Sequence, residues 1–291
     1  MPAASQTQNR TVWMVSREYD GLAGAGGVKD VSRQLAESLA NGSSWAVRVV
    51  IPRYGFMGPE ELGFAPLPLP GETASGRGKG QDRYHYDVEM NYAGEYRRET
   101  VSFWQAEKKG VVLYLVEAER FAEKLSVYTY TAAEELRHSW QRQGTGHFDY
   151  FAMNILLQKA ALALMVLLDE RPSVIHCQDG HTAVLPAMIR EIDGYRHYFR
   201  QTGAVVTIHN AGIGYHQEVE DLRFAAAVTG LPGPVVNDSL LGKAFDPFIA
   251  ASPYAEFNTV SEEYARELQQ TTEDERTGWL GHHLLQRGVA L

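Results

Sequence analysis

The positions of apolar residues along the chain predict strands and helices in alternation. Residues 11–15 and 46–51 are short apolar runs with β-branched side chains, and each is typical of a buried strand. Between them, apolar residues recur at spacings of three and four from Val28 to Leu39, which predicts an amphipathic helix. A strand, a helix and a second strand in such a short stretch predict a βαβ unit with a parallel sheet.

The same alternation continues to the end of the sequence. Further buried strands are expected at 111–116, 173–176, 204–208 and 257–260. Helices are expected at 148–168 and 182–192, with Pro186 near the start of the second, where proline is tolerated, and Ser261 as the N-cap of a third. The pattern predicts an α/β domain with a doubly wound, mostly parallel, Rossmann-like sheet.

Two segments depart from this alternation. Residues 84–90 and 96–104 alternate polar and apolar side chains on either side of a turn at 91–94, which predicts a β-hairpin insertion. Residues 64–83 are rich in proline, glycine and charge and predict a flexible surface loop.

Composition and charge narrow the class of protein. Of the 291 residues, 44% are hydrophobic and 22% charged, which are ordinary globular values. The formal net charge of −9 disfavours a nucleic-acid partner. The single cysteine, Cys177, excludes an internal disulfide framework and favours a reducing, cytoplasmic compartment. The polar start predicts no signal peptide, and the longest apolar run, nine residues at 160–168, is too short to predict a membrane span.

Ligands of doubly wound sheets bind beyond the carboxyl ends of the strands, so the residues there are the first candidates for function. After the first strand comes the glycine-rich stretch 21–27. Its backbone N–H groups could approach a phosphate, or the glycines could simply allow a turn with positive φ. It is not a Walker A loop, because Gly26 is followed by Gly27 rather than Lys, and Lys29 stands where a dinucleotide fingerprint has its third glycine.

Three later strand ends also carry polar residues. The segment 176–181, His-Cys-Gln-Asp-Gly-His, could contact a substrate, cap the following helix through His176 and Asp179, or bind a metal, for which its spacing is cramped. His209 and Asn210, with the loop up to Gln217, supply donors and acceptors suited to sugar hydroxyls, although a lone His at a strand end is often a satisfied core residue. The last, 259–261, is typical of a capped helix.

In order and spacing these strand ends resemble the N-terminal catalytic half of bacterial glycogen synthases and plant starch synthases. That family has a Glu followed six residues later by Lys-x-Gly-Gly-Leu, then His-x-x-Asp-Trp-His-x-Gly, Thr-Ile/Val-His-Asn and Thr-Val-Ser-x-x-Tyr-Ala-x-Glu, with Pro-x-Tyr after its second strand. The matching segments are Glu18 with Gly24–Val28, His176–Ala183, Thr207–Asn210, Thr259–Glu267 and Ile51–Tyr54. The resemblance covers about residues 11–291.

The resemblance implies a glucosyltransferase of the GT-B type, built from two Rossmann-like domains. Such enzymes transfer glucose from ADP-glucose or UDP-glucose to an α-1,4-glucan with retention, and they need no metal or other cofactor. Carried over by position, the catalytic residues are Asp179 and His209. The implied substrate-binding residues are Glu18, Gly26, Gly27, His181, Asn210 and Tyr215.

The sequence also departs from the family pattern. Gly24 replaces the Lys of Lys-x-Gly-Gly, Gly180 replaces the Trp of Asp-Trp-His, and the expected Tyr-Gln-Gly is delayed to Tyr215–Gln217. Residues 1–291 are expected to form one N-terminal catalytic domain, without the family's C-terminal nucleotide-binding domain. Because the GT-B active site lies between two domains, we expect little activity from this chain alone and a separate C-terminal domain as a possible partner.

Two other functions remain open at this point. The chain could be a non-catalytic glucan-binding or regulatory subunit derived from such a domain, which the replacement of Lys by Gly24 would suit. It could also be an unrelated nucleotide-binding α/β protein, although that explains the glycine-rich loop and none of the later motifs.

Overall fold

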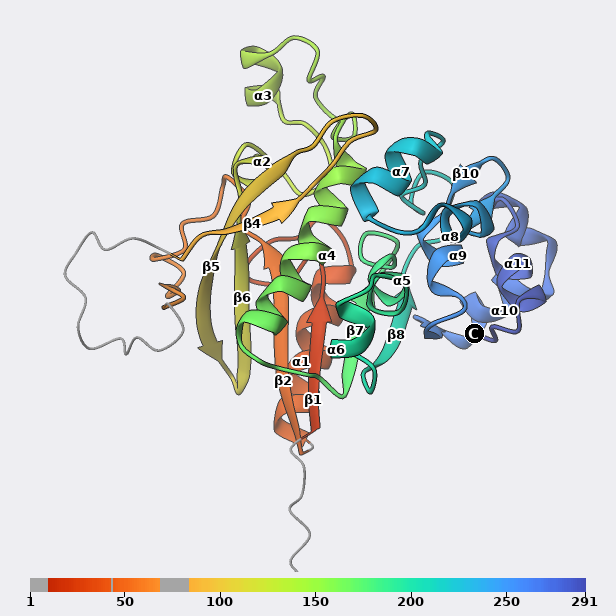
Figure 1. Cartoon of the computed structure of the whole chain (residues 1–291), viewed down its shortest axis with the longest axis horizontal. Coiled ribbons are helices and arrows are strands. Elements are labelled where there is room, and N and C mark those ends of the chain that lie inside the picture. Colours follow the sequence, from red (N-terminus) through yellow and green to blue (C-terminus); the bar gives the residue numbers. More distant parts are fainter. Residues whose placement is uncertain (1–9, 43, 69–83) are drawn as a thin grey trace, which may run out of the picture.

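The computed structural model describes residues 10–42, 44–68 and 84–291. Its main sheet has nine strands in the order β11-β8-β7-β1-β2-β6-β5-β3, with β4 paired to β5 (Figure 1). The strands are β1 Arg10–Val15, β2 Trp45–Pro52, β3 Ala65–Pro66, β4 Tyr86–Glu89, β5 Arg98–Lys108, β6 Val111–Glu117, β7 Val174–Gln178, β8 Gly203–Ile208 and β11 Glu256–Thr259. A separate two-stranded sheet pairs β9 Leu240–Leu241 with β10 Ala244–Phe245.

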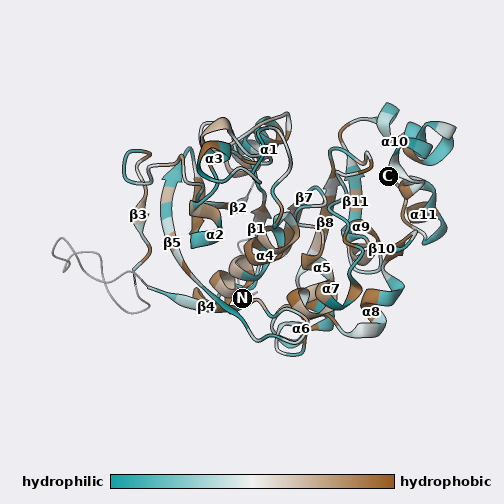
Figure 2. Cartoon of the chain, turned by 90° about the horizontal axis from the view of Figure 1, so that it is seen from above, coloured by the Kyte–Doolittle hydropathy of each residue, from teal (hydrophilic) through white to brown (hydrophobic). Residues whose placement is uncertain are grey.

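The helices occupy the connections between the strands. They are α1 Val28–Gly42, α2 Glu119–Ala122, α3 Ala132–Arg137, α4 Tyr150–Leu167, α5 Leu185–Glu191, α6 Tyr195–Tyr198, α7 Leu222–Thr229, α8 Gly233–Asp238, α9 Pro247–Ala251, α10 Glu262–Gln270 and α11 Leu280–Gln286, with the 3₁₀ helix η2 at Thr272–Thr277. Seen from above, α1 and α4 lie on opposite sides of the central strands (Figure 2). The sheet is therefore covered on both faces, as the parallel pattern predicted.

The strand order creates a switch point beside β1. From β1 the chain moves to β2 and β6 on one side, and it later returns to β7, β8 and β11 on the other. All of these neighbours pair in parallel, whereas β5 joins the sheet antiparallel to β6. Connections leave β1 and β7 toward opposite sides, so a crevice is expected at the carboxyl ends of these two strands.

Buried apolar side chains on the two faces of the sheet form the core. Figure 2 shows the hydrophobic colour concentrated along α4, α5 and the central strands, while α10 is mostly hydrophilic. By length and composition α4 could cross a membrane, but 83% of it is buried inside this fold, where it packs as a core helix. Cys177 in β7 is fully buried, and burial raises the pKa of its thiol.

Several expectations about single elements are confirmed with changed boundaries. The hairpin is present as β4 and β5, but β5 is longer than expected and pairs with β6, so the insertion extends the main sheet. Within the expected loop 64–83, Ala65–Pro66 forms an edge strand, and residues 69–83 lie outside the described part. The helix expected from Thr182 begins only at Leu185, after a turn.

Candidate functional site

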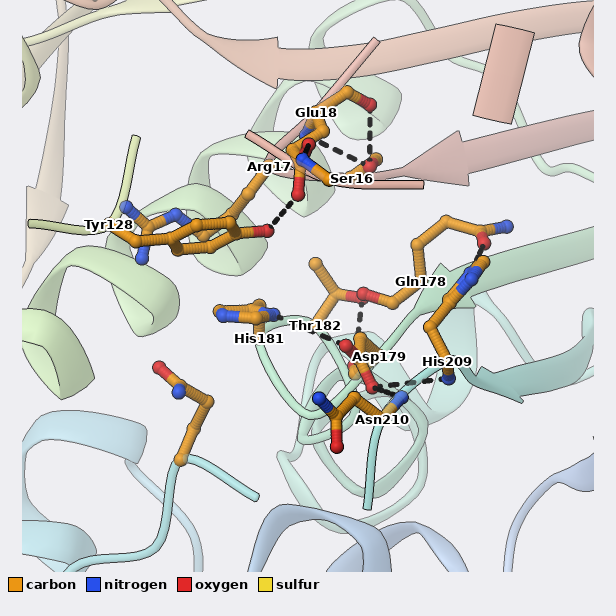
Figure 3. A network of polar contacts seen from close by, with 12 residues as sticks. Ser16, Arg17, Glu18, Tyr128, Gln178, Asp179, His181, Thr182, His209 and Asn210 are labelled. Atoms are coloured by element: carbon orange, nitrogen blue, oxygen red, sulfur yellow. Dashed lines mark hydrogen bonds and ion pairs between the residues drawn. The ribbon is translucent and has the colours of Figure 1, made fainter. Parts of the chain in front are cut away.

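The polar residues singled out in the sequence come together at the switch point. Glu18 follows β1, Asp179 follows β7 and His209 follows β8, so the parallel sheet places all three at one edge. Figure 3 shows Glu18 and Tyr128 on one side of this edge and Asp179, His209 and Asn210 on the other. A chain of contacts joins the sides: the Tyr128 hydroxyl donates to Glu18, and its ring lies 5.0 Å from that of His181.

The carboxylate of Glu18 holds the glycine-rich loop. Its Oε2 accepts hydrogen bonds from the backbone N–H of Ala25 at 2.7 Å and of Gly26 at 3.1 Å, while Oε1 accepts from Tyr128. Glu18 is only 1% exposed, so the bonds are shielded from water. The N–H of Gly26, which we expected to face a ligand, therefore already donates to Glu18. The next N–H that could face a ligand is that of Gly27.

Gly26 and Gly27 leave open space at the start of α1. A Cβ built on either residue would meet no atom within 4 Å, and neither residue has a positive φ. Within this stretch the alternative explanation, a turn that needs positive φ, applies only to Gly21, at φ 81°. The first N–H groups of a helix have no acceptor within the helix, so this end of α1 presents donors to an open surface.

Two residues of this site were not predicted from the sequence. Arg17 is 3% exposed and donates to the Tyr54 hydroxyl at 3.1 Å, to the side-chain oxygen of Asn154 at 3.2 Å and to the Val127 carbonyl. These acceptors are neutral, and the guanidinium shares its surroundings with the buried carboxylate of Glu18, since both act on Tyr128. It also lies 5.1 Å from the ring of Tyr128, the second unpredicted residue. No pattern in the sequence singled out Arg17, which directly precedes Glu18.

Asp179 occupies a strained and buried position directly after β7. Its φ of 65° lies in the left-handed region, which is unusual for a residue other than glycine. Its Oδ1 accepts from the backbone N–H groups of His209 and Asn210 at 3.3 and 3.5 Å. Burial raises the pKa of its carboxyl to about 7, although these N–H groups favour the charged form.

One alternative for this segment, that His176 and Asp179 cap the following helix, is wrong for both residues. The N-cap residue of α5 is Val184, which makes no side-chain cap, and Asp179 turns instead toward the loop after β8. His176 points to the neighbouring strand, where its Nε2 lies 2.7 Å from the hydroxyl of Thr207.

His209 and His181 are neutral groups at this edge. His209 is partly exposed, and its Nε2 lies 2.7 Å from Oε1 of Gln178, the last residue of β7. Burial lowers the pKa of His209 to about 4. His181 is 4% exposed, and burial together with the charge of Arg17 holds its pKa well below the usual range.

The loop after His209 separates the remaining candidates. The side-chain oxygen of Asn210 accepts from the N–H of Gly212 at 2.9 Å and shapes the loop. Tyr215 is 54% exposed, so the structure leaves it at the surface. His216, in contrast, is buried and paired with Asp246 at 2.7 Å, which raises the pKa of the imidazole. This pair ties the loop to α9.

The fourth strand end forms the capped helix that the sequence predicted. The Ser261 hydroxyl accepts from the N–H of Tyr264 at 3.1 Å, at the start of α10. The Tyr264 hydroxyl in turn accepts from the N–H of Ala211 at 2.9 Å. In residues 10–42, 44–68 and 84–291, no group of three or more His, Cys, Asp or Glu side chains could hold a metal ion.

Comparison with known proteins identifies the family. The family model described as the starch synthase catalytic domain matches residues 11–284. The chain belongs to this family. It is 25% identical over 264 residues to a glycogen synthase of Lachnospira eligens, covering 89% of this chain and 47% of that protein. A glycogen synthase of Aliivibrio fischeri strain MJ11 is 24% identical over 268 residues, 90% of this chain and 47% of that protein.

A solved structure shows the same fold. The catalytic domain of starch synthase IV from Arabidopsis thaliana, bound to ADP and acarbose, aligns with a TM-score of 0.68 at 20% identity, covering 96% of this chain and 50% of that one. The predicted α/β fold of the GT-B type is thus confirmed, as is the resemblance to glycogen and starch synthases. The chain spans about half the length of the curated relatives it matches.

The structure explains two of the three departures from the family motifs, those at Gly180 and Gly24. A Cβ on Gly180 would lie 2.3 Å from the backbone oxygen of His216, so no larger residue fits while the loop after His209 keeps this path. A Cβ on Gly24 would lie 2.3 Å from Cδ of Lys29, whose stem crosses the loop there. Lys29 therefore lies against the very position where the motif has its lysine.

Proposed function

We propose that this domain forms one wall of a glucosyltransferase that transfers glucose from ADP-glucose or UDP-glucose to an α-1,4-glucan, with retention. The observation that carries the proposal is the open N-terminus of α1, where Gly26 and Gly27 leave room beside the edge that holds Asp179 and His209. Departure of a nucleoside diphosphate develops negative charge, and N–H groups at a helix start stabilise such charge.

Positive charge at this edge supports an anionic donor. Among the described residues, Arg17 donates to neutral acceptors, and the carboxylate of Glu18 lies near enough to offset part of its charge. The ammonium of Lys29 is bound to Asp30 at 2.8 Å and stays partly exposed. The ion pair with Asp30 holds this ammonium at the start of α1, where the helix dipole disfavours a cation, and we propose that it also faces the anionic donor. We assign Lys29 the charge that Gly24 cannot supply.

The polar groups opposite suit a sugar. His209, His181 and Asn210 are uncharged at neutral pH and can exchange hydrogen bonds with hydroxyls. The proposed reaction uses no metal or other cofactor, and we propose the cytoplasm as its place. The starch synthase IV structure of the same fold was solved with ADP and acarbose, a ligand pair consistent with this assignment.

The decisive experiment measures incorporation of labelled glucose into glycogen from ADP-glucose and from UDP-glucose. It is run with the chain alone, with a C-terminal half of a glycogen synthase added, and with a chelator. We expect incorporation only with the added half and no effect of the chelator. Tight binding of glycogen without any incorporation or nucleotide-sugar binding would favour the alternative, a non-catalytic glucan-binding subunit.

A variant of Lys29 tests the source of the positive charge. Lys29→Met keeps the stem that crosses Gly24 and removes the ammonium. We expect the affinity for ADP to fall about 3- to 10-fold and that for maltooligosaccharides to stay the same, since a partly exposed charge contributes modestly. Equal ADP affinity in both proteins, by calorimetric titration, would contradict this role.

A further inference from the structure

Among the described residues, the side chain of Gln178 has one hydrogen-bond partner, His209. Gln178 is 1% exposed, and its Oε1 lies 2.7 Å from Nε2 of His209 (Figure 3). Its amide nitrogen is buried and has no partner among the described residues. A buried amide with an unused nitrogen costs free energy that a single hydrogen bond does not recover. Stability therefore does not explain a glutamine here.

The contact fixes where His209 carries its proton. The low pKa of His209 leaves the ring neutral, with one N–H and one lone pair. A carbonyl oxygen only accepts, so the nitrogen that faces Oε1 must donate. Nε2 is then protonated and Nδ1 keeps the lone pair.

We propose that Gln178 is a positioning residue that holds His209 with its proton on Nε2, so that Nδ1 recognises a hydroxyl group of the sugar rather than an anionic oxygen. This inference rests on the proposed function, because it assigns the sugar, and not the diphosphate, to His209. Nδ1 has no hydrogen-bond partner in the described structure, so its lone pair is available to a ligand.

The neighbouring His176 provides an internal reference. Its Nε2 lies 2.7 Å from the Thr207 hydroxyl, and that hydroxyl donates its only proton to Asn258 at 2.6 Å. Thr207 can therefore only accept from His176, which fixes the proton of His176 on Nε2 without any help from Gln178. The charges that act on His209 and its neighbours are those of Glu18 and Arg17.

The first test reads the tautomers by NMR in protein labelled with ¹⁵N-histidine. In the wild type we expect the Nε2–H form for both His176 and His209. In Gln178→Met, which keeps the volume and removes the acceptor, His209 should shift toward a mixture while His176 stays unchanged. A wild-type His209 in the Nδ1–H form, or the same His209 tautomer in both proteins, would overturn the proposal.

Melting temperatures distinguish a positioning role of Gln178 from a structural one. Gln178→Met should melt at the wild-type temperature or above, because it removes a buried amide with an unused nitrogen. Gln269→Met is the matched control: Gln269 is also buried, but it donates to Val289 and accepts from Leu291, and it belongs to α10. We expect this control to melt lower and to bind ligand normally. A large loss of stability in Gln178→Met would contradict the positioning role.

The binding test compares ADP-glucose, its monodeoxy-glucose analogues and ADP. Gln178→Met should bind ADP-glucose about 3- to 10-fold more weakly and ADP equally well, and it should lose the wild type's discrimination against one monodeoxy analogue. Equal losses for ADP and ADP-glucose would overturn the assignment of His209 to a hydroxyl. If the wild type binds no nucleotide sugar even with the C-terminal half added, the proposed function fails, and the tautomer measurement still decides what Gln178 does.

Discussion

The two loops that meet at the site are built in opposite ways. The loop after β1 carries Gly26 and Gly27 with open space above them, and its backbone is held from below by Glu18. The turn after β7 is packed tightly: Asp179 has a left-handed φ, and Gly180 lies against the backbone of His216. In the first loop the glycines leave the start of α1 open to a ligand, and in the second the glycine lets two backbone segments pack closely. The same residue type is expected to respond differently to substitution in each.

The largest effect is expected at Gly180. Gly180→Ala places a Cβ 2.3 Å from the backbone oxygen of His216, and only a shift of backbone can relieve that contact. Overpacking of this kind costs about 3 kcal/mol, or more where the backbone cannot yield. Thermal melts should show a drop of about 6–12 °C. A variant as stable as the wild type would show that the turn after β7 is not tightly packed.

Asp179 should show the next largest effect, and with a characteristic pH dependence. Its folded-state pKa of about 7 lies above the ordinary 3.8, so the folded chain holds the proton more tightly than the unfolded one. The contribution of Asp179 to stability therefore falls as pH rises from about 4 to about 7, and Asp179→Asn removes that part of the pH dependence.

We expect Asp179→Asn to match the wild type at pH 4 and to be more stable by about 2 kcal/mol at pH 8, with the full pKa shift setting a ceiling of about 4 kcal/mol. Denaturant melts at the two pH values check this. Transfer of glucose should fall in the same variant if the carboxylate takes part in the reaction. A stability difference that is independent of pH would contradict the raised pKa.

A substitution of Gly27 tests whether the loop after β1 is open. Gly27→Ala introduces a methyl group into empty space at a negative φ, so the fold should keep its stability or gain about 0.4–1 kcal/mol. The same methyl group blocks close approach to the start of α1, and we expect roughly tenfold weaker ADP binding, equivalent to about 1.4 kcal/mol. Gly26→Ala is the control, because its N–H is already bound to Glu18. Loss of stability in Gly27→Ala would remove the contrast between the loops.

His209 should show the smallest effect. His209→Ala removes one hydrogen bond to a neutral group, which costs about 0.5–1.5 kcal/mol, or roughly 2- to 13-fold in affinity for a nucleotide sugar. The melting temperature should change little, since the side chain is partly exposed. Calorimetric titration and melts on one preparation distinguish this from a core histidine, whose loss would lower stability and leave binding unchanged.

Local patterns predicted the long strands of the main sheet, the helices α1, α4, α5 and α10, and the strand ends that form the site. They did not predict the elements α7–α9 and β9–β10 between β8 and β11. Thr207–Asn210 ends a buried strand, and a parallel sheet brings such ends to one edge whatever the details of packing. Contacts between distant segments were not predictable in this way. Tyr128 reaches Glu18 across 110 residues, and the pairing of Gln178 with His209 depends on the register of two strands.

Lys29 shows most clearly what could not be predicted from the sequence. In the sequence, Gly24 reads as the loss of a charge, because Lys29 lies five residues further on. Only the path of the Lys29 stem across Gly24 shows that the two positions share one place in space.

The buried thiol of Cys177 can report how often the fold opens around the site. It is the single thiol of the chain, fully buried in β7, one residue before Gln178 and two before Asp179. A thiol reagent can reach it only when β7 or the elements around it open, so the rate of labelling measures how often that happens. A ligand that binds the folded site disfavours this opening, and the rate of thiol labelling must fall by the same factor. The labelling rate of Cys177 thus measures occupancy of the site without any assay of the reaction.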